Sequence, residues 1–201
     1  MSASTYSEFE QLVNNVKHEE SLQKFLEAHK DLLIRTFNQG AHLPTIFSKF
    51  KFADEFIPDF VMVGHRSSWS WDVDLIEIEP AILSQPLLNK QGQSTGRRRT
   101  AEGQIQKWQM WIEKHRDHFV TRISERLQKT GAWDTQPQFY TLSDGTHQSI
   151  IVWYRIIIGR RNNFQGRGDE YRRNFYRESG NRIEIVSWDR LLDRARLFFN
   201  Q

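Results

Sequence analysis

Apolar residues near the amino terminus recur every three to four positions. They are Tyr6, Phe9, Leu12, Val13 and Val16, followed by Leu22, Phe25, Leu26 and Leu33. This spacing predicts two helices, or one helix broken near Lys17 and His18. A period of two follows, because residues 46–52 alternate between apolar and polar positions and so predict a first strand. Residues 59–63 and 69–79 predict two further strands, joined by turn residues at 64–68.

The second half of the chain predicts helices that alternate with strands. After a loop at 80–100, residues 102–127 predict one long amphipathic helix. Residues 148–158 are almost all apolar and often β-branched, as expected of a central strand. We expect a helix at 169–178, a short strand at 182–186 and a closing helix capped by Ser187. This order predicts an α/β fold with a mixed sheet flanked by helices.

The length and composition favour one domain of ordinary size. The 201 residues divide into entry helices at 1–40 and a core with closing helices at 41–201. No apolar run has the length of a membrane span, since the run at 150–158 is interrupted by Arg155. The absence of cysteine excludes disulfides, thiolate nucleophiles and cysteine-bound zinc. With no signal-peptide pattern at the amino terminus, we expect a cytoplasmic protein.

Basic residues are unevenly distributed, which favours a polyanionic partner. The net charge is only +3, but residues 160–196 hold ten arginines against six acids. A further cluster is formed by Arg97, Arg98 and Arg99. Arginine suits contact with phosphate, although each single arginine is also explained by a solvated helix face.

Three carboxylates, those of Asp59, Glu77 and Glu79, carry the chemistry of this chain. Side chains alternate along a strand, so Glu77 and Glu79 share one face of the third predicted strand. If that strand pairs antiparallel with the one that Asp59 begins, the three carboxylates converge. Oxygen ligands on a rigid sheet are what Mg²⁺ requires, and such an ion can activate water against a phosphodiester. An acidic strand surface facing solvent is the alternative explanation, but the segment 69–79 holds four acids and no base.

The order of these elements and motifs resembles the PD-(D/E)XK nuclease superfamily. More narrowly, the chain resembles the nuclease domain of Shedu-type anti-phage defence proteins. The resemblance is carried, in order, by ESLQKFLE from Glu20, PDF from Pro58, DLIEIEP from Asp74, AEGQIQKW from Ala101, IIIGR from Ile156 and IEIVSWDRLL from Ile183.

This resemblance implies a Mg²⁺- or Mn²⁺-dependent nuclease acting on DNA, with RNA left open by the residues. It implies that Asp59 and Glu77 bind the metal together with the backbone carbonyl of Ile78. Gln104 is implied as a site residue, and Glu20 as a weaker candidate. We assign Arg97, Arg98, Arg99 and Lys107 to phosphate contact.

Glu79 departs from the family pattern, which places a lysine there. Glutamate can act as a general base or bind a second metal. A lysine from elsewhere, such as Lys107 one turn after Gln104, is another source of positive charge. The third alternative is a site that has lost catalysis, in a protein that binds nucleic acid or another protein.

The remaining motifs add little. His115 and His118 have metal-compatible spacing, but a solvated helix face explains them better. There is no phosphate-binding glycine loop and no nucleophile-elbow sequence, so neither a nucleotide cofactor nor a serine hydrolase is indicated. The resemblance implies a homo-oligomer, for which Phe175, Tyr176, Phe198 and Phe199 are a candidate surface; closure of the domain's own core explains them as well.

Overall fold

The computed structural model describes residues 3–38, 40–66, 70–91, 93–131, 149–164 and 182–199. Five strands form one sheet in the order of the chain: β1 (His42–Ser48), β2 (Phe60–Arg66), β3 (Ser70–Ile78), β4 (Ser149–Ile157) and β5 (Ile183–Val186). The first three strands form an antiparallel meander, and β4 and β5 continue the sheet parallel to β3. The mixed sheet flanked by helices is therefore confirmed.

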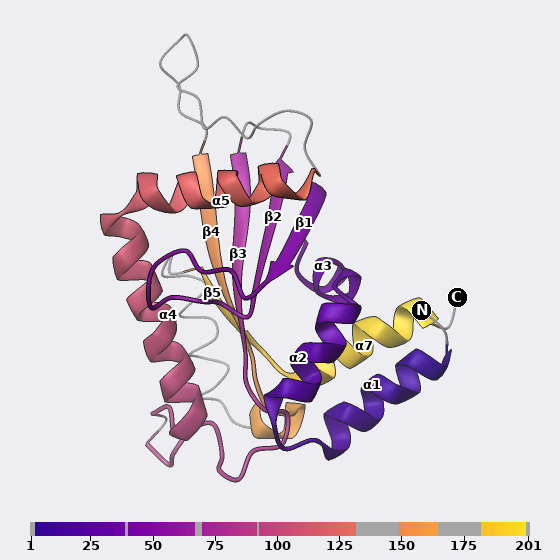
Figure 1. Cartoon of the computed structure of the whole chain (residues 1–201). Coiled ribbons are helices and arrows are strands. Elements are labelled where there is room, and N and C mark those ends of the chain that lie inside the picture. Colours follow the sequence, from indigo (N-terminus) through magenta and orange to yellow (C-terminus); the bar gives the residue numbers. More distant parts are fainter. Residues whose placement is uncertain are drawn as a thin grey trace.

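Helices cover both faces of this sheet (Figure 1). One face packs on α4 (Gly96–Lys114) and α5 (Arg116–Thr130), which lead from β3 to β4. The other face packs on α1 (Ala3–Asn15), α2 (Glu19–Ala28), α3 (Asp31–Phe37) and α7 (Trp188–Phe199). A short 3-10 helix, η1 (Arg161–Phe164), follows β4.

The period of two in β2 and β3 divides the core into two layers. Val61 and Val63, with Val73 and Leu75, belong to the layer under α4 and α5. Their neighbours Phe60, Met62, Ile76 and Ile78 belong to the layer under α1 and α7. Neighbouring apolar positions of these strands therefore pack under opposite helical layers.

Several predicted boundaries are wrong, each for a local reason. The break near Lys17 is confirmed, but a second break at His29 and Lys30 makes three entry helices. The helix expected at 102–127 begins earlier, at Gly96, and divides at His115, where the backbone leaves the helical region. The apolar spacing continues from Ile112 to Phe119 across this break, so the pattern could not reveal it.

The first strand differs at both ends. It begins at His42 and ends at Ser48, and Lys49 then takes a left-handed backbone with φ of 49°. Phe50 and Phe52 are buried as the alternation suggested, but they reach the core from a loop. The helix expected at 169–178 and Trp69, the start of the third predicted strand, lie outside the described residues.

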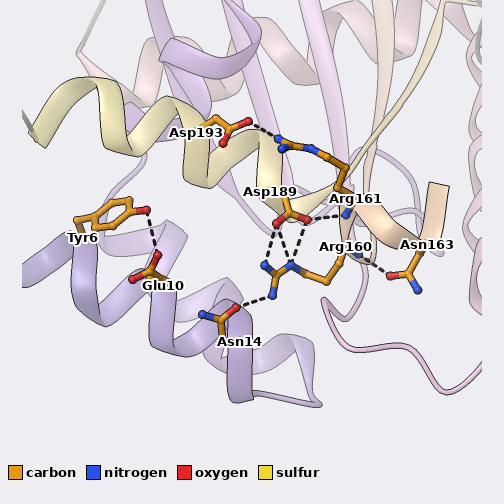
Figure 2. A network of polar contacts seen from close by, with 8 residues as sticks. All are labelled: Tyr6, Glu10, Asn14, Arg160, Arg161, Asn163, Asp189 and Asp193. Atoms are coloured by element: carbon orange, nitrogen blue, oxygen red, sulfur yellow. Dashed lines mark hydrogen bonds and ion pairs between the residues drawn. The ribbon is translucent and has the colours of Figure 1, made fainter. Parts of the chain in front are cut away.

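A polar network fastens the end of β4 to the outer helices (Figure 2). The Arg160 guanidinium donates to both carboxylate oxygens of Asp189 in α7, at 2.8 to 3.1 Å, and to Asn14 in α1 at 2.6 Å. The backbone N–H of Arg161 also donates to Asp189. Three elements distant in sequence are thus joined by charge-assisted hydrogen bonds.

In the part of the chain that the structure describes, no helix is both long and apolar enough to cross a bilayer.

Trp188 fixes the chain immediately after β3. Its buried indole N–H donates to the carbonyl oxygen of Glu79 at 2.8 Å, and its backbone N–H donates to Gly159. Gly159 in turn donates to Pro80 and has φ of 61°, where a Cβ would lie 2.8 Å from Leu83. The ends of β3 and β4 and the start of α7 are therefore held together.

Replacing Trp188 with Phe should destabilise the fold more than replacing Trp108 with Phe. Both side chains are fully buried, but the indole nitrogen of Trp108 has no hydrogen-bond partner. W188F leaves the Glu79 carbonyl unsatisfied, which costs roughly 1–3 kcal/mol beyond the loss of ring volume. Urea unfolding measures both variants. Equal losses would show that the indole hydrogen bond contributes nothing.

Candidate active site

Asp59 and Glu77, the carboxylate pair, lie side by side at one end of the sheet. Phe60 pairs with Ile76, so the preceding and following residues of the two strands are neighbours. Alternation directs both carboxylates to the face covered by α4 and α5. The Asp59 carboxylate accepts a hydrogen bond from the backbone N–H of Ile78 at 2.8 Å, which fixes its position against β3.

Lys49 is the cation that reaches this pair. Its backbone N–H donates to the Asp59 carbonyl at 2.9 Å, and its ammonium donates to the Asp59 carboxylate. Burial alone would lower the pKa of Lys49, but the hydrogen bond and charge of Asp59 raise it. Lys49 was not predicted as a site residue, because it lies inside the strand expected at 46–52 and only the pairing of Ser48 with Phe60 brings it beside Asp59. A lysine within a predicted strand is a weak signal.

The carboxylate pair is not neutralised by this one lysine. Burial, reinforced by the charges of Asp59 and Glu79, raises the pKa of Glu77 to about 9. Burial also raises the pKa of Asp59, although Lys49 and the Ile78 N–H oppose the shift. The Oε2 atom of Glu77 is buried and has no hydrogen-bond partner among the described residues. If both carboxyl groups were ionised, the site would hold more negative charge than the surrounding protein offsets.

Glu79 belongs to a different set of contacts. It is 6% exposed and faces Arg97, whose guanidinium lies 3.4 Å from Glu79 and 3.6 Å from Glu19 in α2. Burial and the charge of Glu19 raise the pKa of Glu79 to about 7, against the opposing charge of Arg97. The pKa of Glu79 therefore lies near neutral pH, because the charges of Glu19 and Arg97 act on it in opposite directions.

The charges of Asp59 and Glu79 both act on Glu77, but the three carboxylates are not grouped as metal ligands. Within the described ranges, no group of three or more His, Cys, Asp and Glu side chains is placed to hold a metal. The other two acids of β3 have arginine partners from elsewhere in the fold: Arg66 binds Asp72 and Arg155 binds Asp74. The excess of acid in the segment is therefore confined to the site.

The three neighbouring arginines each contact the protein itself. Arg98 is fully buried beside Glu102, at 2.9 Å, so it cannot reach a phosphate. Arg99 donates twice to the carbonyl of Ser94, and Arg97 bridges Glu79 and Glu19. Of the four residues assigned to nucleic acid, Arg97, Arg99 and Lys107 are exposed on α4.

Gln104 and Glu20 differ in their relation to the site. Gln104 is partly buried on α4, two turns after Arg97 and so on the same side of that helix. Glu20 lies on the exposed side of α2, where it pairs with Lys24. Its neighbour Glu19 is the entry-helix acid that reaches the site through Arg97.

The two histidines expected on a solvated helix face are exposed, and each also contacts an aromatic ring. The rings of His115 and His118 lie 4.9 and 5.7 Å from that of Trp111. Both histidines remain exposed, and they belong to no metal-binding group among the residues that the structure describes.

The model of the family named Shedu protein SduA, C-terminal, matches residues 16–192, from just before α2 into α7. This match contains the carboxylate pair, Lys49, Glu79 and Gln104. The chain belongs to the Shedu SduA C-terminal family. No curated protein matches it.

The residues of this Shedu-family site fit a hard divalent cation. Two carboxylates stand beside the backbone of Ile78 at a fixed strand end, and oxygen donors of this kind suit Mg²⁺ or Mn²⁺. The unpartnered Oε2 of Glu77 is a buried acceptor without a donor. A bound cation would supply the positively charged partner that this oxygen lacks.

We expect the metal-free protein to lose stability as the pH rises from about 5 to 9. Because the pKa of Glu77 in the folded state is about 9, against 4.5 ordinarily, the folded state binds the proton more tightly across this range. E77Q removes that cost and should raise the free energy of unfolding at pH 8.5 by about 1–3 kcal/mol.

Urea unfolding in EDTA at several pH values measures this effect. Glu8→Gln, a change at an exposed position of α1, is the matched control and should leave the pH profile unaltered. A profile of E77Q that parallels the wild type would contradict the assignment of the pH dependence to Glu77.

Proposed function

We propose that this chain is a divalent-metal-dependent nuclease that hydrolyses phosphodiester bonds in DNA. The observation that carries the proposal is the buried carboxylate pair, under-neutralised and fixed by the backbone at the end of a sheet. Membership of the Shedu family supports a part in anti-phage defence. The helix, antiparallel meander, crossover helices and parallel strand agree with a PD-(D/E)XK core.

Asp59 and Glu77 would hold Mg²⁺ or Mn²⁺, with the Ile78 carbonyl completing the protein's share of the ligands. The metal would activate water and stabilise negative charge on the phosphodiester. Glu79 is suited to accept a proton from the attacking water, because its pKa of about 7 lies near working pH. Gln104 would orient the water or a phosphate oxygen from α4.

Lys49 would supply the positive charge that the family pattern places at Glu79. Its ammonium contacts Asp59 directly, whereas the previously considered Lys107 is exposed on α4. An ammonium here offsets carboxylate charge before the metal binds and faces the phosphate afterwards. The positive charge would thus come from the residue after β1 rather than from the residue after β3.

Cutting both strands of DNA requires two sites, which a two-fold dimer would provide. We therefore propose that the protein acts as a homo-oligomer. Of the aromatic residues assigned to that interface, Phe175 and Tyr176 lie outside the described residues. Phe198 and Phe199 end α7.

The alternative is a nuclease fold without chemistry that binds nucleic acid or a partner protein. Glutamate in place of lysine at position 79 favours it. Binding that falls steeply with salt, with no cleavage in Mg²⁺ or Mn²⁺, would support this alternative.

Incubation with plasmid DNA and Mg²⁺ or Mn²⁺ should produce cleavage that D59A and E77A lower by about 10³-fold. The reason is that metal-ion catalysis contributes several kcal/mol of transition-state stabilisation. Glu20→Ala should retain activity, since Glu20 is an exposed residue paired with Lys24. Calorimetry with Mn²⁺ should show binding to the wild type and to Glu20→Ala. Cleavage undiminished in D59A or E77A would refute the site.

Lys49→Met should lower the rate of cleavage by about 100-fold, as expected when a charged group in contact with the reacting atoms is lost. Lys49→Arg should recover part of the rate, because it keeps the charge. Mn²⁺ affinity of the Met variant, measured by calorimetry, should equal or exceed that of the wild type, since a competing cation is removed. Lys24→Met, at an exposed ion pair on α2, is the control. A rate within threefold of the wild type would exclude Lys49 from the chemistry.

A further inference from the structure

A basic groove of about 240 Å³ opens between α5 and the segment that follows β1. Five basic residues and one acid line it: Lys49, Lys51, Arg122, Arg126, Lys129 and Glu125. Arg97, Arg98 and Arg99, by contrast, are held by Glu79, Glu102 and Ser94. The groove is therefore a further concentration of basic charge on the described surface, beside the exposed Arg97 and Arg99.

The groove is continuous with the carboxylate pair, because Lys49 belongs to both. Its ammonium contacts Asp59, while its side chain, 55% exposed, also lines the groove. Lys51 follows two residues later. A chain of phosphates lying in the groove would pass directly to the site that is proposed to cut it.

The groove is also held in shape by contacts across it. The Arg122 guanidinium donates to the carbonyl of Lys51 at 3.5 Å, and the Arg126 guanidinium lies 5.6 Å from the ring centre of Phe47 in β1. These contacts bind α5 to the strand and loop that carry Lys49. The basic side chains are thus arranged before a ligand arrives.

The spacing of the charges on α5 suits a phosphate backbone. Arg122, Arg126 and Lys129 stand at i, i+4 and i+7, so they share one side of the helix over roughly 10 Å. One strand of a duplex presents a phosphate about every 3.4 Å of axis, and this length therefore faces about three phosphates. The ion pairs of Arg122 with Glu125 and of Lys51 with Asp54 are exposed, and pairs of this kind contribute little. A phosphate can therefore replace the acid in each.

We propose that this groove binds the sugar–phosphate backbone of duplex DNA and guides it to Asp59 and Glu77. The inference rests on the proposed function and identifies the surface along which the DNA substrate would lie. Contacts to phosphate carry no sequence information, so the groove provides affinity and position rather than specificity.

The test compares two variants that each remove two positive charges. Arg126→Gln with Lys129→Gln changes the groove, and Arg194→Gln with Arg196→Gln changes exposed positions of α7 under the opposite face of the sheet. Fluorescence anisotropy with a labelled 20-base-pair duplex is measured in EDTA, which prevents cleavage, from 50 to 200 mM salt. A single-stranded oligonucleotide of equal length is the second probe.

The groove variant should bind the duplex about tenfold or more weakly, and its salt dependence should fall by about two in the slope of log affinity against log salt. The α7 variant should bind as the wild type does. Equal affinity of the groove variant and the wild type, equal loss in both variants, or an effect seen only with the single strand would overturn the proposal.

The absence of duplex binding by the wild type would overturn it as well. Mn²⁺ calorimetry on the same protein preparation after removal of EDTA separates the two hypotheses, because metal binding at the carboxylate pair does not depend on Arg126 or Lys129. Metal binding without duplex binding removes the groove alone. Absence of both removes the proposed nuclease site with it.

Discussion

The pairing of β2 with β3 holds two carboxylates together, and the conformation and contacts of the neighbouring residues reflect that constraint. Asp59 and Glu77 cannot separate without a change of strand register, because Phe60 pairs with Ile76 and Ile78 donates to Asp59. Lys49 takes a left-handed backbone, a conformation that usually costs a non-glycine residue about 1 kcal/mol or more, at the point where its ammonium meets Asp59. Strain and electrostatic repulsion are concentrated at one strand end, as is common at functional sites.

Acids elsewhere in the sheet show how buried carboxylates outside the candidate site are paired with basic side chains. Asp74 is as deeply buried as the site residues, yet Arg155 donates to it at 2.7 Å. Arg155 also contacts Glu184, which is bound in turn by Arg190. Burial still raises the pKa of Asp74 to about 6, which is far below the value of about 9 for Glu77. The difference arises because Asp74 has a guanidinium partner, whereas no described residue places a guanidinium against Glu77.

The sequence was sufficient for the features that depend on local alternation. It predicted the mixed sheet, and it placed Asp59 within one residue of the start of β2. It could not reveal Lys49, whose place depends on the end of β1 and on a left-handed residue. Nor could it distinguish Glu19 from Glu20, because one residue of helix turns a side chain by about 100° and separates the site from solvent. Arg98 was misjudged because a run of arginines resembles a solvated cluster until Glu102 is found beside it in the core.

Arg97 lies between two helical layers that the sheet otherwise separates. Glu19 belongs to α2, on the side of α1 and α7, whereas Arg97 belongs to α4 on the opposite side of the sheet (Figure 1). Glu79 directly follows the last residue of β3, and Arg97 contacts both acids. One guanidinium is therefore shared by a site carboxylate and a carboxylate of the entry helix. A shift of α2 relative to α4 would redistribute this cation between its two partners and change the protonation of Glu79. The chemical state of the site is in this way tied to the relative position of the two layers, so a displacement of the entry helices is converted into a change in the basicity of Glu79.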